Sequence, residues 1–116
     1  MRLNPADATE LGIADGDIIR LWNERGALLA AAQCSDQVAR SVVRLSTGAW
    51  YAPQSLPGSG LTCVNGNPNA VTSDCGASDL SQGCAGQLSL VSVEKWTGAV
   101  PDAVPHAQIL TLHQPL

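Results

Sequence analysis

The sequence contains few of the residues on which many small proteins depend. It has no Phe, three Trp and one Tyr, and only 14% of its residues are charged. Because aromatic rings are so scarce, Val, Leu, Ile and Ala must build the hydrophobic core. Hydrophobic residues make up 45% of the 116 residues, which is typical of a single globular domain and not of a disordered chain.

Basic residues are also scarce. Six Lys and Arg stand against ten Asp and Glu, so the formal net charge is −4. Nucleic-acid binding without sequence preference requires Lys and Arg to neutralise phosphates, and membrane-surface binding requires a polybasic patch. No apolar run reaches the roughly 18 residues of a membrane-spanning helix. We therefore expect neither a nucleic acid nor a membrane as a partner.

The usual patterns of metal ligands are missing. The four Cys form no CxxC pair, and the two His (His106 and His113) lie near the C-terminus. A zinc site requires clustered nitrogen and sulfur ligands, so no metal site is expected in this chain. One disulfide among Cys63, Cys75 and Cys84 is an alternative, but free thiols are favoured.

The N-terminal part predicts a short helix. Asn4 is a good N-cap, Pro5 suits the first helical position, and Gly12 suits the position after the C-cap. These signals predict a helix of about two turns. Its inner face would carry Ala8 and Leu11.

The next residues predict a β-meander over residues 17–46. Residues 18–22 form a first strand, and a hairpin loop over residues 23–26 places Gly26 where a positive φ is required. Residues 27–34 and 41–46 follow as two further strands. Short strands with small aliphatic side chains are typical of a small barrel.

The composition changes after residue 47. Seven of the eleven Gly lie between residues 47 and 87, which predicts a long loop of the kind that is usually functional. Residues 78–82 are expected to form one helical turn, and Trp50 and Tyr51 to pack at the end of the barrel. Residues 88–95 predict a final strand, and residues 97–116 an extended tail.

Three segments together carry a family resemblance. They are Asn-Pro-Ala-Asp-Ala to Asn-Glu-Arg-Gly (residues 4–26), Gly-Ala-Trp-Tyr-Ala-Pro (48–53) and Gly-Asn-Pro-Asn-Ala-Val-Thr-Ser-Asp (66–74), extended by residues 78–83. Over roughly residues 2–96 the chain resembles the C-terminal domain of the dimethyl sulfoxide reductase family of molybdenum enzymes. Within the family it is most similar to the branch that reduces biotin sulfoxide and trimethylamine N-oxide, and residues 84–86 and 94–96 favour the biotin sulfoxide side. The first segment alone is common among double-psi barrels, whereas the third, at this spacing, is specific.

The resemblance implies a mainly β fold, a six- or seven-stranded double-psi β-barrel (aspartate decarboxylase-like) with short helices. Residues 1–96 would be the domain that binds bis(molybdopterin guanine dinucleotide), and residues 97–116 a tail. The molybdenum would be ligated outside this domain, by the remaining domains of a parent reductase that acts on a small sulfoxide or N-oxide. The chain would then be an excised domain without activity in isolation, from either the periplasm or the cytoplasm.

The third segment supplies the candidate cofactor-binding residues. Glycine lets the backbone approach a ligand, and an Asn side chain both donates and accepts hydrogen bonds. For Asp74 a turn or capping role is an equal alternative. Arg25 is expected to pair locally with Glu24 rather than with a phosphate. The candidates are Gly66, Asn67, Asn69, Thr72, Asp74, Ser78 and Gln82.

Two other classes of function remain as alternatives. A stand-alone double-psi barrel that docks other proteins would have an exposed apolar groove and no response to nucleotides. A pyruvoyl-dependent decarboxylase would require self-cleavage between Gly and Ser, for which only Gly58-Ser59 is available. That pair lies in a Gly- and Pro-rich loop, so this alternative ranks last.

Overall fold

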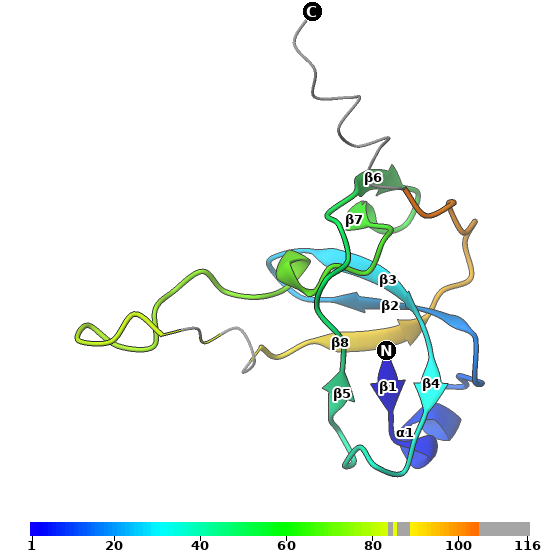
Figure 1. Cartoon of the computed structure of the whole chain (residues 1–116). Helices are drawn as coiled ribbons and strands as arrows, with labels where there is room; N and C mark the ends of the chain where they lie inside the picture. The colour runs from blue at the N-terminus through cyan, green and yellow to red at the C-terminus, as the bar shows by residue number, and fades with distance from the viewer. Residues whose placement is uncertain (84, 86–88, 105–116) are drawn as a thin grey trace, which may run out of the picture.

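Two mixed β-sheets form the body of the molecule. The computed structural model describes residues 1–83, 85 and 89–104. One sheet has the strand order β4-β1-β5 and the other β6-β7-β3-β2-β8 (Figure 1). The strands are Arg2–Leu3 (β1), Ile18–Trp22 (β2), Ala27–Ala31 (β3), Gln33–Cys34 (β4), Val43–Arg44 (β5), Pro53–Leu56 (β6), Gly60–Cys63 (β7) and Ser92–Lys95 (β8). The mainly β prediction is confirmed, but these residues form two sheets and no closed barrel.

The predicted first helix is present as α1 (Pro5–Glu10). The Asn4 side chain accepts a hydrogen bond from the Ala6 N–H at 2.9 Å, and Gly12 has a φ of 67°. Ala8 is buried as expected. Leu11 is 45% exposed, so its prediction as an inner-face residue is wrong. The helix ends one residue earlier, and Ile13 packs with Ala8 in the core instead.

The β2–β3 hairpin matches the prediction closely. Ile18 pairs with Ala31 and Trp22 with Ala27 in antiparallel register. The predicted positive φ at Gly26 is wrong, because Gly26 is not among the residues whose φ is positive. A Cβ atom at Gly26 would instead collide with the Ala70 carbonyl oxygen. The close approach of residues 68–70 to the hairpin is what requires glycine there.

The predicted meander does not form. The expected strand over residues 27–34 is interrupted at Ala32, so β3 belongs to one sheet and β4 to the other. β5 is shorter than predicted and pairs with β1 rather than with β4. β1 itself was not predicted, since two residues are too few to show a periodic pattern.

The long loop contains a second hairpin. β6 and β7 pair antiparallel inside the stretch expected to lack regular structure, and β7 pairs in parallel with β3. Gly58 and Gly60 have φ angles of 80° and 71° in its turn. β6 is an edge strand, where Pro53 is tolerated because no ladder partner needs its missing N–H. The high Gly and Pro content therefore led the sequence analysis to predict a loop where β6 and β7 form.

Aliphatic residues build the core, as the composition predicted. One cluster is centred on Leu3, Ile13 and Ile19, and a second contains Leu21, Leu28, Cys63 and Val71. The expected packing of Trp50 and Tyr51 is wrong, since these side chains are 53% and 51% exposed. Both side chains therefore lie at the surface and not in the core.

The last strand and its neighbours differ in detail from expectation. β8 begins at Ser92, Leu90 is 88% exposed, and Leu88 lies outside the described residues. Residues 78–82 form no helical turn, and only residues 79 and 80 are bends. Residues 97–104 contain no helix or strand, whereas the rest of the expected tail, with both His, lies outside the described residues.

The cysteines and metal ligands can be described for most of the chain. Cys34, Cys63 and Cys75 are free thiols, and Cys84 lies outside the described residues. Within the described part of the chain no three His, Cys, Asp or Glu side chains gather as metal ligands do. The helices found there are all too short to cross a bilayer.

Candidate functional site

Residues 65–72, the anchored segment, are held firmly against the core. Gly66 is buried with a φ of 75°, and a Cβ atom there would lie 3.1 Å from the Leu29 carbonyl oxygen. Asn67 caps a 3-10 helix (Pro68–Ala70) by accepting a hydrogen bond from the Asn69 N–H at 2.9 Å. Val71 is 3% exposed and packs in the second core cluster. The anchored segment therefore presents its polar groups on a fixed backbone.

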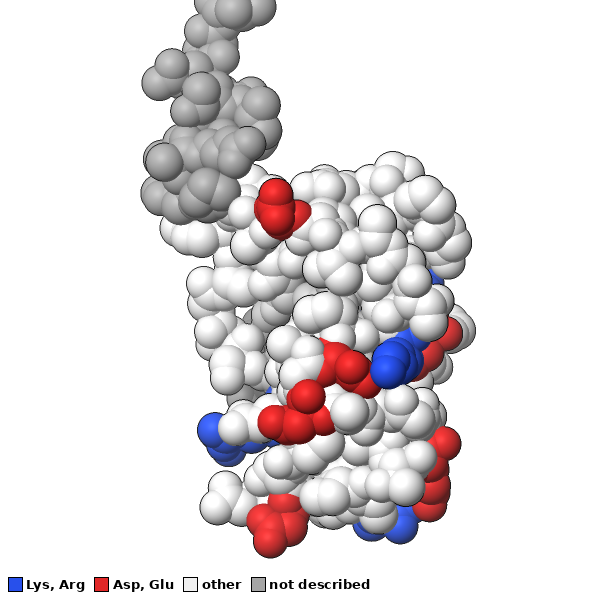
Figure 2. Space-filling model, turned by 90° about the vertical axis from the view of Figure 1, so that its right-hand side faces the viewer, with Lys and Arg blue, Asp and Glu red and all other residues white. Residues whose placement is uncertain are grey.

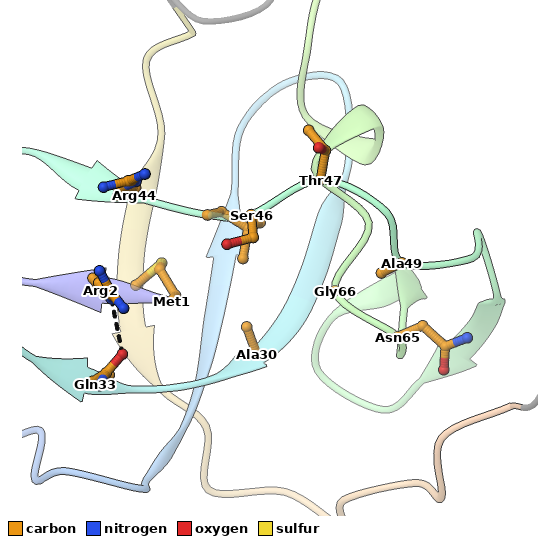
Figure 3. Close-up of a pocket in the computed structure, with 11 residues that line it drawn as sticks. Met1, Arg2, Ala30, Gln33, Arg44, Ser46, Thr47, Ala49, Asn65 and Gly66 are labelled. Carbon is orange, nitrogen blue, oxygen red and sulfur yellow. Dashed lines mark hydrogen bonds between the residues drawn. The ribbon is translucent and has the colours of Figure 1, made fainter.

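Two cavities lie along this segment and share one wall. The first, of about 430 Å³, extends from Arg2 and Arg44 to Gly66 (Figure 3). The second, of about 390 Å³, lies between residues 47–51 and residues 67–69. Thr47 and Ala49 line both cavities. We call the two together the groove.

The two ends of the groove differ in chemistry. The second cavity is bounded by the exposed Trp50 and Tyr51 on one side and by Asn67 and Asn69 on the other. Its lining contains no charged residue. This end combines aromatic rings with amide groups, a combination suited to a flat heterocycle that carries hydrogen-bonding edges.

The first cavity is polar and carries positive charge. Among the residues that the structure describes, its charged side chains are Arg2 and Arg44, and no carboxylate lines it. Met1 also lines this cavity, and its amino group donates to the Ala31 carbonyl oxygen at 2.7 Å. Burial, and then the charge of Arg2, lower the pKa of this amino group. This end of the groove is suited to an anion.

Three of the seven predicted site residues line these two cavities, and a fourth lines a neighbouring one. Gly66 lines the first cavity, whereas Asn67 and Asn69 line the second. Thr72 lines a neighbouring cavity of about 360 Å³, which shares Arg44 and Leu45 with the first. The structure thus brings these four residues to one side of the molecule.

The other three predicted residues lie apart from the groove. Asp74, Ser78 and Gln82 are exposed on residues 73–83, the outer segment, which extends away from both sheets (Figure 1). Ser78 and Gln82 bond to their own turn: the Gln82 amide donates to the Ser78 carbonyl oxygen at 3.2 Å. None of the three lines a cavity described above.

The sequence reasoning missed the residues that face the anchored segment. Thr47 adjoins the Gly-Ala-Trp-Tyr-Ala-Pro motif and Ala49 is part of it, so that motif could have indicated both. Arg2 and Arg44 had no such signal, because their proximity depends on the pairing of β1 with β5. Asn65 lines the first cavity, yet its side chain bonds to Val104 through two hydrogen bonds of 2.8 Å.

Comparisons with known proteins agree with the resemblance. A sequence model of the family described as "Molydopterin dinucleotide binding domain" matches residues 1–88. A biotin sulfoxide reductase of Cereibacter sphaeroides is 49% identical over 102 residues, 88% of this chain and 13% of the relative. Trimethylamine-N-oxide reductases of Vibrio vulnificus and Escherichia coli K12 are each 44% identical, over 85% and 84% of this chain.

These matches also show how small a part of the relatives is represented. The chain spans 12–13% of the length of the three relatives, which therefore contain further domains. The predicted resemblance is confirmed, and with it the class of cofactor, a molybdopterin dinucleotide. The chain belongs to the family of molybdopterin dinucleotide-binding domains.

Proposed function

We propose that this chain is the domain of a molybdenum S-oxide or N-oxide reductase that holds bis(molybdopterin guanine dinucleotide) through the groove. The named relatives reduce biotin sulfoxide or trimethylamine N-oxide, which supports this branch of substrates. The metal ligand and the substrate site would belong to the remaining domains of the parent enzyme.

The observation that carries the proposal is the pairing of motifs across the second cavity. Trp50 and Tyr51 come from one motif of the resemblance, and Asn67 and Asn69 come from another. The two motifs lie far enough apart in sequence that only the fold brings them to one cavity. Aromatic residues are scarce in this chain, and two exposed rings beside amide side chains suit a stacked and hydrogen-bonded guanine.

The residues present fit the rest of the cofactor as well. Gly66 lets the backbone approach a ligand, and the cationic end of the groove suits phosphate groups. When bound, the cofactor supplies the redox chemistry, and the protein supplies binding, orientation and electrostatics. Within this chain we assign that role to Gly66, Asn67, Asn69 and Thr72. We assign Asp74, Ser78 and Gln82 to contacts made only in the parent enzyme.

The double-psi barrel remains part of this proposal. β1 pairs in parallel with β4 and antiparallel with β5, and β7 pairs in parallel with β3 and antiparallel with β6. The continuous β3–β4 segment connects the two sheets. Each sheet thus combines parallel and antiparallel pairing, and this supports the two interlocked loops of a double-psi barrel. In this proposal residues 1–96 are the domain and residues 97–116 the tail.

A protein-docking function is the second candidate. Leu11 and Val42 are exposed beside a cavity of about 300 Å³ that Leu3, Val43, Val91 and Val93 also line. This surface of apolar residues, which Asp7, Glu10 and Ser41 border, suits contact with another protein surface, including the other domains of a parent enzyme. The decarboxylase alternative has no such support, since the Ser59 hydroxyl accepts from Arg20 at 2.6 Å within a tight turn.

Calorimetric titration with GDP tests the proposed function. Asn69 is the cleanest residue to change, because its backbone N–H keeps the bond to Asn67 when the side chain is removed. We expect GDP to bind the chain, and Asn69→Ala to weaken binding about fivefold to tenfold through the loss of one or two hydrogen bonds. Gln37→Ala, an exposed amide outside the groove, is the matched control. GDP that binds both variants and the unaltered chain equally would contradict the assignment.

A further inference from the structure

The basic residues of this protein form ion pairs with two exceptions, Arg2 and Arg44. Four of the six basic residues form ion pairs: Arg20 with Glu94, Arg25 with Glu24, Arg40 with Asp7 and Glu10, and Lys95 with Asp17. Arg2 and Arg44 form none with the described carboxylates. Ten acidic residues are available in the sequence, so this is not a shortage of partners.

The two unpaired arginines are direct neighbours. Arg2 of β1 stands opposite Arg44 of β5 in antiparallel register, so both side chains lie on the same face of the sheet. The next pair, Leu3 and Val43, packs on the core side. Like charges placed opposite each other destabilise a sheet. Two arginines without carboxylates are therefore an arrangement that an anionic ligand would stabilise.

The surroundings of the pair offer further hydrogen-bonding groups and no negative charge. Gln33 lies beside Arg2 on the same face and orients it, since the Arg2 Nε donates to the Gln33 Oε1 at 2.9 Å. Ser46 and Thr47 place two hydroxyl groups in the same cavity (Figure 3). Residues 45–51 and 65–69, which contribute most of the remaining groove wall, contain no charged residue. The arginine pair is thus a cationic centre in a protein of net charge −4.

We propose that Arg2 and Arg44 bind the diphosphate of the cofactor, which sets the direction of the nucleotide in the groove. Arginine forks bind phosphate oxygens in pairs, and two opposed forks match the two phosphates of a diphosphate. The guanine base then lies between Trp50 and Asn69, and Thr47 and Ala49 form the wall under the ribose. This inference rests on the proposed function and adds which residues hold which part of the ligand.

Figure 2 gives the contrast on another face of the molecule. There acidic and basic side chains lie close together over the lower part, as expected for ion-paired residues. A bare anion would meet carboxylates at such places. The groove differs because its two cations have no carboxylate beside them. Selective binding of a diphosphate is therefore expected at Arg2 and Arg44 and not at the other basic residues.

The test uses NMR titration of the ¹⁵N-labelled chain with three probes: GDP, guanosine and inorganic pyrophosphate. The variants are Arg2→Gln and Arg44→Gln, each checked for an unchanged amide spectrum outside the groove. Arg25→Gln is the control, because it removes the same charge from a residue that lines neither cavity. Arg44→Lys separates charge from the arginine fork.

We expect each groove variant to weaken GDP and pyrophosphate binding about tenfold, and to change guanosine binding less than twofold. The affinity of Arg44→Lys for GDP and pyrophosphate should lie between that of the unaltered chain and that of Arg44→Gln. Pyrophosphate should shift the amides of residues 2, 33 and 44–47, and guanosine those of residues 50, 51 and 67–69.

Three results would overturn the inference, and they differ in what they leave standing. Equal GDP binding by the unaltered chain and by both groove variants would refute the diphosphate assignment but not the proposed function. If Arg25→Gln lost as much affinity for GDP and pyrophosphate as the groove variants, the effect would come from the net charge of the protein and not from the arginine pair. A well-folded chain that binds neither GDP nor guanosine would refute the inference together with the proposed function.

Discussion

The anchored segment (residues 65–72) and the outer segment (residues 73–83) are adjacent in the chain and similar in composition, yet the fold treats them differently. The first is pinned by Gly66 against Leu29 and by the buried Val71. The second is bonded mainly to itself, and Leu80 in it is fully exposed. Polar loop residues thus become a binding surface only where apolar neighbours fix their backbone.

The largest expected effect is at Gly66. Gly66→Ala would place a Cβ at 3.1 Å from the Leu29 carbonyl oxygen and force a non-glycine residue to a φ of 75°. We expect the free energy of unfolding to fall by about 1–3 kcal/mol, as measured by urea denaturation. Gly83→Ala in the outer segment is the control, since its nearest contacts are 3.8 and 3.9 Å away. Equal losses in both variants would remove the distinction between the segments.

A second prediction compares two apolar side chains. Val71→Ala removes methyl groups from the second core cluster, which should cost about 2 kcal/mol of stability. Leu80→Ala changes a side chain that lies entirely in solvent and should stay within about 0.5 kcal/mol. Thermal and urea unfolding of the two variants measure both values. A destabilising Leu80→Ala would show that the outer segment packs in solution.

A third prediction concerns low pH, which should lower the stability of the sheets and helix against which the anchored segment packs. The hydrogen bond from Arg40, followed by that from the Ser41 N–H, lowers the pKa of Asp7 below its ordinary 3.8. Lys95 has the same effect on the pKa of Asp17. A depressed carboxyl pKa contributes stability above about pH 4 that is lost as the pH falls through the folded-state value.

The measurement is the melting temperature between pH 7 and pH 2.5. Asp7→Asn should lower it at pH 7 and make the curve shallower below pH 4, because the variant has one carboxyl fewer to protonate. Asp36→Asn is an exposed control without an ion pair among the described residues. Parallel curves for the unaltered chain and Asp7→Asn would contradict this account.

The smallest expected effect is a gain in stability. Arg44→Thr removes one of two like charges that face each other across β1 and β5, and it introduces a residue with good β propensity. Without ligand, we expect the melting temperature to rise by about 2 °C. Adding pyrophosphate should stabilise the unaltered chain but not the variant. A melting temperature that falls without ligand would mean that Arg44 contributes to the fold itself.

The sequence predicted local structure well where the signal was local. The Asn4 cap, β2 and the loop to β3 were all recognised from neighbouring residues. β1 and the β6–β7 hairpin were missed, because the first is two residues long and the second lies among Gly and Pro. Both are stabilised by pairing with distant strands, which no window of sequence contains.

The candidate site shows the same division. Gly66, Asn67 and Asn69 were predicted from their motif and do line the groove. Arg2 and Arg44 were not, since they are 42 positions apart and meet only through strand register. The family resemblance identified the class of cofactor, whereas the arrangement of charges required the fold.

The most direct test of the central claim, that the groove beside the anchored segment holds the nucleotide, is a map of the amides that respond to saturating GDP. We predict saturable shifts in residues 44–51 and 65–72, with Asp74, Ser78 and Gln82 unchanged in the isolated chain. Shifts confined to residues 73–83, with the groove silent, would contradict it and assign nucleotide binding to the outer segment instead.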